Sequence, residues 1–114
     1  MDRLKEYLQI VERIVGGHLE APPKEEQIET LSVCDRVGGH YLLLEIGWQP
    51  PRRVYSVVFH IRLKGGKIWI EQDWTEHGVA RELLEAGVPP EAIELGFQPL
   101  EMRPHAHLKM ATSH

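Results

Sequence analysis

Two glycine pairs, Gly38-Gly39 and Gly65-Gly66, constrain the fold of this chain more than any other feature of its sequence. Each pair lies between two runs rich in β-branched and aromatic residues, which favour strands. Because glycine adopts the positive φ angles that a two-residue hairpin turn requires, each pair predicts a β-hairpin. The expected strands lie at about residues 28–36 and 40–48 in the first hairpin, and at about 53–64 and 67–73 in the second. Pro50-Pro51 is expected to break the chain between them.

The glycine turns also predict which residues face one another across each hairpin. With two-residue loops, Leu31 faces Ile46 and Val33 faces Leu44 in the first hairpin. In the second hairpin, Leu63 faces Ile68 and Ile61 faces Ile70. Since all four pairs are aliphatic, we expect them to share the face of the sheet that forms the core.

A helix is expected at each end of the sheet. Apolar residues recur at helical spacing near the N-terminus, at Leu4, Tyr7, Leu8, Val11, Ile14 and Val15. Asp2 is the expected N-cap and Gly16-Gly17 the expected end, with a loop at about 18–26. After the fourth strand, Thr75 is expected to cap a helix whose apolar side carries Val79, Ala80, Leu83 and Leu84. Gly87 ends that helix, and Pro89-Pro90 begins a short helical turn through Ile93.

These elements predict an α+β fold. We expect a four-stranded antiparallel sheet of two hairpins, with the N-terminal helix and the C-terminal helix plus short helical turn on one face. A chain of 114 residues hides roughly 65% of its unfolded surface, enough for one modest core. We therefore expect a single domain over residues 1–114, with an irregular tail at about 99–114 whose last residues are mobile.

Charge and composition narrow the classes of function. The formal net charge is −4, whereas a protein that holds DNA alone usually presents a basic face. No apolar run approaches the roughly 20 residues that cross a membrane, and the N-terminus lacks the layout of a signal peptide. The single cysteine, Cys34, excludes an internal disulfide. We expect a cytoplasmic protein without a cofactor.

An ordered series of motifs resembles one known family. Lys67-Ile-Trp-Ile and Thr75-Glu76 precede Val79-Ala80 with Glu82-Leu83, and Gly87-Val88-Pro89 and Leu95-Gly96-Phe97 follow. The same order of motifs is typical of the fdxN element excision controlling factors, the XisI family. Upstream, Tyr41–Trp48, Arg53-Val54 and His60-Ile61 extend the resemblance, which covers roughly residues 28–97. The tail after Arg103 departs from the family pattern.

The resemblance implies a non-catalytic accessory factor. XisI proteins are similar small α+β proteins, often encoded in cyanobacteria beside XisH, which resembles nucleases in fold. The implied role is control of DNA element excision through an XisH-like partner, with a site-specific recombinase and DNA contacted indirectly. Two alternatives remain open: a direct DNA-binding accessory factor, and an antitoxin-like regulator of the nuclease-fold partner.

The second face of the sheet is the expected site of partner binding. By parity it carries apolar residues, among them Cys34, Tyr41, Leu43, Val54, Val58 and Trp69, although a water-facing sheet should alternate more cleanly. We expect the C-terminal segment, a second copy in a homodimer, or another protein to cover it. The candidate partner-binding residues are Tyr41, Leu43, Val58, His60, Trp69 and Glu71.

The sequence also raises an acid–base pair, a direct DNA contact and a zinc site as alternatives. The predicted register sets His60 opposite Glu71, which could serve acid–base chemistry, but a structural cross-strand pair is favoured because no third group is evident. Arg62 is expected opposite Trp69, where a cation–π contact would be a structural feature more often than a site. A direct DNA contact would use basic residues near the hairpin ends: Arg52, Arg53, Arg62, Lys64 and Lys67. His105, His107 and His114 lack the ligand spacing of a zinc site.

Overall fold

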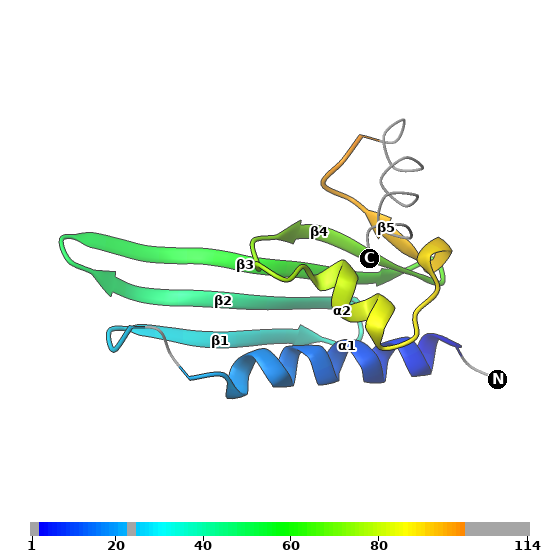
Figure 1. Ribbon diagram of the computed structural model, residues 1–114, viewed down its shortest axis with the longest axis horizontal. Helices are drawn as coiled ribbons and strands as arrows, with labels where there is room; N and C mark the ends of the chain where they lie inside the picture. The colour runs from blue at the N-terminus through cyan, green and yellow to red at the C-terminus, as the bar shows by residue number, and fades with distance from the viewer. Residues whose placement is uncertain (1–2, 23–24, 100–114) are drawn as a thin grey trace.

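The computed structural model describes residues 3–22 and 25–99, which form a five-stranded mixed sheet with two helices on one face (Figure 1). The strand order is β1-β2-β3-β4-β5. Four antiparallel strands follow the chain: β1 (Ile28–Asp35), β2 (His40–Gln49), β3 (Arg52–Lys64) and β4 (Lys67–Asp73). The α+β class is confirmed, and Pro50-Pro51 forms a turn within one continuous meander instead of separating two hairpins.

The sheet has a fifth strand that the sequence did not predict. A 3-10 helix, η1 (Pro90–Ala92), confirms the short helical turn, but the chain then forms β5 (Ile93–Leu95), which pairs parallel to β4. Three residues are too few to show the alternation that identifies a strand in a sequence. The sheet is therefore mixed, and β5 closes the core at the β4 edge with buried Ile93 and Leu95.

Helix α1 (Arg3–Glu20) buries Tyr7, Val11 and Val15 against the sheet. The expected end at Gly16-Gly17 was wrong, because the helix runs through both glycines to Glu20. Each glycine costs about 1 kcal/mol in a helix interior, and contacts made by the last turn offset this cost. His18 packs edge-on against Phe59, with ring centroids 5.3 Å apart, and its Nε2 lies 2.8 Å from Glu82 Oε2. Asp2 lies outside the described residues.

Helix α2 (Val79–Glu85) begins later than expected. Gly78 occupies the N-cap position, and Asp73 caps the helix from a distance, since its Oδ2 accepts from the Val79 backbone N–H at 2.6 Å. Thr75 takes part by accepting from the Gly78 N–H at 3.1 Å and donating to Asp73 Oδ1 at 2.6 Å. Gly87, with φ +100°, ends the helix as predicted.

The two glycine turns differ. Gly65-Gly66 forms the expected two-residue turn, so the facing pairs Leu63–Ile68 and Ile61–Ile70 are confirmed. The first hairpin closes at Asp35 and His40 across a four-residue loop, so its predicted register was wrong by two residues. Leu31 faces Leu44, and Val33 faces Leu42. The Asp35 carboxylate and carbonyl accept from the Gly38 and Gly39 N–H groups at 2.9 and 2.8 Å, which stabilises the longer loop.

A β-bulge at Val58 decides which side chains form the core. Leu44 faces Val57 on one side of the bulge, and Leu43 faces Phe59 on the other. Side chains along a strand point alternately to the two faces of the sheet. The extra residue at Val58 therefore exchanges the faces to which the side chains of β3 point on one side of the bulge relative to the other. Tyr41 and Leu43 therefore join Phe59 and Ile61 under the helices, on what we call the helix face.

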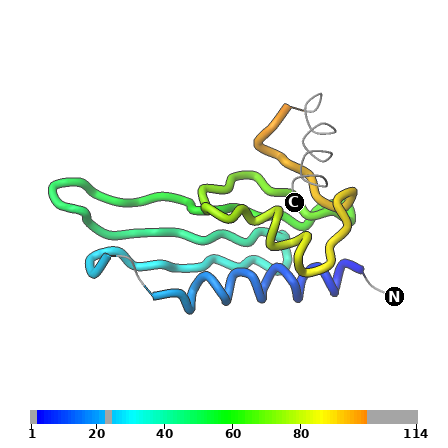
Figure 2. Tube along the Cα trace, viewed as in Figure 1, coloured from blue at the N-terminus to red at the C-terminus, as the bar shows by residue number. Residues whose placement is uncertain are grey.

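The core lies between the helix face and the two helices, whose course along the sheet can be followed in Figure 2. The fully buried large side chains are Tyr41, Phe59, Ile61, Ile68, Ile70, Leu83, Ile93, Val11 and Val79. The far end of the β2–β3 hairpin projects beyond β1 and α1. The opposite side of the sheet, which we call the outer face, carries the first-hairpin residues that were expected in the core: Leu31, Val33, Leu44 and Ile46.

Candidate protein-interaction face

The outer face carries a contiguous group of aliphatic side chains from three neighbouring strands. This group, which we call the apolar zone, consists of Leu31, Val33, Leu42, Leu44, Ile46 and Val57. None of the six belongs to the core cluster under the helices. Val33 is 47% exposed. Within the described ranges, both helices pack on the other side of the sheet, and neither covers the apolar zone.

The strand register makes the apolar zone continuous. Leu31, Leu44 and Val57 form one row across β1, β2 and β3, and Val33 and Leu42 form part of the next row. Directly facing residues in a sheet have Cβ atoms about 4.5–5.5 Å apart, so neighbouring side chains in these rows are in contact. Ile46 extends the zone towards Tyr55, which is 70% exposed. The result is a contiguous group of apolar side chains across β1, β2 and β3.

A polar zone lies beside the apolar zone, toward the Gly65-Gly66 end of the sheet, and its centre is a pair of histidines. His40 Nδ1 lies 3.1 Å from His60 Nε2, and both side chains are half-buried. Burial lowers the pKa of His60, neighbouring His40 and Arg62 lower it further, and Glu71 opposes them. The lowered pKa favours an uncharged His60 near neutral pH, when one imidazole can donate to the other.

Two ion pairs lie beside the histidines in the polar zone. Arg62 Nη1 lies 3.1 Å from Glu71 Oε2, and Lys67 Nζ lies 2.8 Å from Glu94 Oε2. Arg62 faces Trp69 as predicted, and the Lys64 ammonium lies 5.6 Å from the centroid of the Trp69 ring. These pairs leave the rim of the apolar zone polar with little net charge, as at the rim of a protein–protein interface.

The predicted acid–base pair of His60 and Glu71 is not formed, because the two residues do not face each other. A second bulge lies at Glu71, so His60 faces Gln72 instead. Glu71 is directed to Arg62, and His60 contacts His40. The structural cross-strand pair of His60 with Glu71, which the sequence favoured, is therefore not formed either, because each residue has another polar partner.

The predicted partner-binding residues divide into two groups. Tyr41 and Leu43 are 0% and 3% exposed beneath α1, so their assignment to a contact surface was wrong. The Val58 bulge carried them to the helix face. Val58 is the half-buried bulge residue, whereas His60, Trp69 and Glu71 lie with the polar zone. The apolar zone itself was missed as a surface, although the adjacent apolar residues at 41–44 signalled that both faces are hydrophobic.

The candidate DNA-contacting residues do not form one basic patch. Arg52 and Arg53 lie at the Pro50-Pro51 end of β3, and Arg62, Lys64 and Lys67 lie at the other end of the sheet. Lys64 is eleven residues beyond Arg53, which corresponds to about 36 Å along a strand. Two of the five, Arg62 and Lys67, are neutralised by glutamates. A surface that follows a DNA backbone needs its basic groups together.

Two further observations concern the described residues alone. No group of three or more metal-ligating side chains occurs within 3–22 and 25–99. His105, His107 and His114 lie outside these ranges. Neither helix of the described structure is long and apolar enough to cross a membrane.

Comparisons with known proteins agree on one family. The family model described as XisI protein matches residues 1–109. A crystal structure of a XisI-like protein from Anabaena variabilis ATCC 29413 has 32% identity and a TM-score of 0.84, over 90% of this chain and 94% of that chain. The structure of fdxN element excision controlling factor XisI from the same organism has 29% identity and a TM-score of 0.76, over 90% of this chain and 99% of that chain. No curated protein matches the chain.

Proposed function

Because this chain belongs to the XisI protein family, we propose that it is a non-catalytic controlling factor for the excision of a DNA element. One structural relative carries that role in its name, as an fdxN element excision controlling factor. We propose that the factor acts by binding a nuclease-fold protein of the XisH kind, and that recombinase and DNA are reached through this partner.

The apolar zone of the outer face is the observation that supports this proposal. Exposed contiguous apolar surface on a soluble protein is typical of protein-binding sites. Leu31, Leu44 and Val57 would form the desolvated centre of the contact, and the paired charges around Arg62 and Lys67 would form its rim. A site for a DNA backbone would show the opposite chemistry, with unpaired basic groups and few apolar ones.

Co-expression with a XisH-like protein from the same source tests the proposal. The complex would be measured by size-exclusion chromatography with light scattering, which reports the mass of each eluting species. Co-elution at a defined stoichiometry supports the proposal. Separate elution of two folded proteins would overturn it.

Duplex binding provides the contrasting measurement. Fluorescence polarisation of a labelled duplex in low and moderate salt would show a steep salt dependence if the chain binds DNA directly. We expect no saturable binding by the chain alone, because its basic residues are dispersed and partly neutralised. Tight, salt-sensitive binding would favour the direct DNA-binding alternative.

A further inference from the structure

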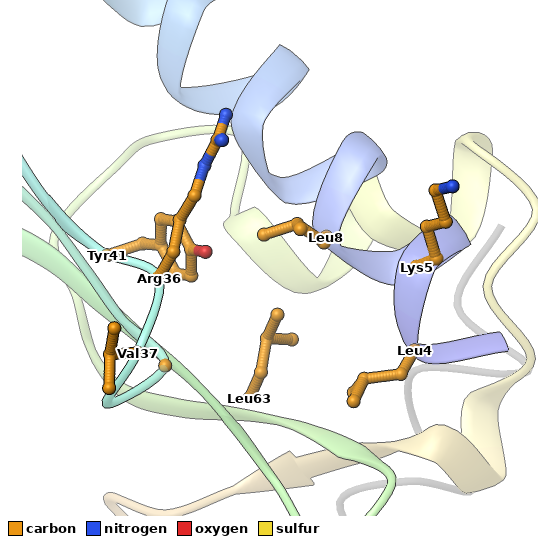
Figure 3. A pocket seen from close by; sticks show the side chains of 8 residues that line it. Leu4, Lys5, Leu8, Arg36, Val37, Tyr41 and Leu63 are labelled. Atoms are coloured by element: carbon orange, nitrogen blue, oxygen red, sulfur yellow. The ribbon is translucent and has the colours of Figure 1, made fainter. Parts of the chain in front are cut away.

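A cavity of about 340 Å³ lies on the helix side of the sheet, between the start of α1 and the β1–β2 loop (Figure 3). Its volume falls at the lower end of the range for small-molecule sites, about 300–1,000 Å³. It is distinct from the outer face, because its floor includes the core residue Tyr41. The lining residues are Leu4, Lys5, Leu8, Arg36, Val37, Gly39, Tyr41 and Leu63.

The walls of this cavity are mainly aliphatic. Leu4 and Leu8 approach from α1, and Val37 and Leu63 approach from the β1–β2 loop and β3 (Figure 3). Leu4 is 49% exposed and Val37 is fully exposed. These two residues therefore keep apolar surface in water that a bound aliphatic group would cover.

The hydroxyl of Tyr41 is the polar group of the site. Tyr41 is fully buried, and its hydroxyl has no hydrogen-bond partner among the described residues. Such groups are rare in folded proteins, since leaving a buried donor unpaired is costly. Figure 3 shows this hydroxyl directed toward Leu8, on the cavity side of the ring. Because the hydroxyl oxygen is itself buried, an acceptor oxygen on a bound molecule would satisfy it only after a neighbouring side chain shifts on binding.

The electrostatics around Tyr41 keep the hydroxyl available as a donor. Burial raises the pKa of Tyr41, Glu12 and Cys34 raise it further, and Arg36 opposes them. Arg36 is held by Glu12, with Nε and Nη2 at 2.7 and 2.9 Å from the carboxylate oxygens. Lys5 makes no ion pair within the described part of the chain, and its exposed side chain lies at the rim. Lys5 is thus a charged residue of the cavity lining that forms no ion pair with another described residue.

From these features we infer that the cavity binds a small aliphatic molecule that carries a carbonyl or carboxylate oxygen. The aliphatic part lies against Leu4, Leu8 and Leu63, and the oxygen accepts a hydrogen bond from the Tyr41 hydroxyl. A carboxylate gains an additional attraction to Lys5, whereas a neutral carbonyl does not. This site is independent of the proposed protein contact on the outer face.

The test uses the full chain and two probes, octanoate and 2-octanone. Each probe would be titrated into labelled protein and followed by ¹H–¹⁵N correlation spectra. We expect saturable shifts at the amides of Leu8, Val37 and Gly39, which line the cavity. Shifts confined to the outer face, or the absence of saturable shifts with either probe, would overturn the inference.

Two substitutions separate the roles of the hydroxyl and the charge. Tyr41→Phe should weaken both probes about 3- to 10-fold, the worth of one neutral hydrogen bond, without lowering the melting temperature, because the lost hydroxyl is unpaired in the free protein. The matched control is Tyr55→Phe, which removes a hydroxyl from an exposed residue of the outer face and should change nothing. Lys5→Gln should weaken octanoate alone. Equal affinities for wild type and Tyr41→Phe would rule the hydroxyl out of the site.

Discussion

Replacing Gly39 with alanine tests how the β1–β2 loop is held against β3. Gly39 has φ +77°, and a Cβ at this position would lie 2.5 Å from the carbonyl oxygen of Leu63. The same two residues are joined by a hydrogen bond from the Leu63 N–H to the Gly39 carbonyl at 2.8 Å. The methyl group therefore forces the loop away from the strand at the point where the two backbones are in contact.

The magnitude follows from three contributions. A left-handed conformation costs an alanine about 1–2 kcal/mol relative to glycine. Loss of the displaced backbone hydrogen bond costs about 0.5–1.5 kcal/mol more. The lower entropy of the unfolded alanine chain returns about 0.4–1 kcal/mol. Gly39→Ala should therefore lower the free energy of unfolding by about 1–2.5 kcal/mol, measured by urea denaturation followed by circular dichroism.

Gly66→Ala is a matched control for this substitution. Gly66 has φ +76°, almost the same as Gly39, but a Cβ there would meet nothing within 4 Å. It should bear the conformational cost without the clash, and so lose about 1 kcal/mol less than Gly39→Ala. Equal losses for the two variants would refute the claim that close backbone approach makes glycine necessary at position 39.

Two further predictions concern the core and the histidine pair. Phe59→Ala removes a fully buried ring that also packs against His18, and should cost about 3–5 kcal/mol in urea denaturation; a loss below about 1 kcal/mol would contradict the assigned core. Because the folded pKa of His60 is lowered, the unfolded chain binds the proton more readily, so the stability due to this group is present above about pH 6.5 and is lost as pH falls through the folded pKa. Chemical denaturation between pH 7.5 and about 5 should therefore show a smaller acid loss in His60→Gln than in wild type, and parallel pH profiles would show that His60 does not titrate in this way.

The parts of the fold that depend on local chemistry could be predicted from the sequence. Gly65-Gly66 sets its own turn, and this was enough to place Ile61 against Ile70. The four-residue loop at Gly38-Gly39 depends on a carboxylate of the preceding strand, Asp35, and so its register was not predictable from the glycines alone. Helix α1 passes Gly17 because of a tertiary contact at His18, which local propensity cannot show.

The bulge at Val58 determines which residues lie on the candidate interaction face. Without an extra residue at Val58, the pairing of Leu44 with Val57 would have continued along β3 and set Tyr41 beside His60 on the outer face. The bulge has no distinctive sequence signal, since valine fits a regular strand equally well. The outer face is apolar, as the sequence predicted for the second face of the sheet. The residues assigned to that face were partly wrong because a one-residue shift exchanges the two faces.

The central claim is that the apolar zone is the surface that binds the partner, and Leu44→Glu tests it most directly. Leu44 lies in the middle row of the zone, between Leu31 and Val57. Ser56→Glu is the matched control, because it adds the same charge at an exposed neighbouring position on the helix face of β3. Circular dichroism would first establish that both variants are folded.

Each variant would then be co-expressed with the proposed XisH-like partner and analysed by chromatography with light scattering. We expect Ser56→Glu to co-elute with the partner as wild type does, and folded Leu44→Glu to elute alone. A burial of one unpaired carboxylate at the centre of an interface costs several kcal/mol, enough to reduce affinity more than a hundredfold. Co-elution of Leu44→Glu at wild-type stoichiometry and affinity would contradict the account.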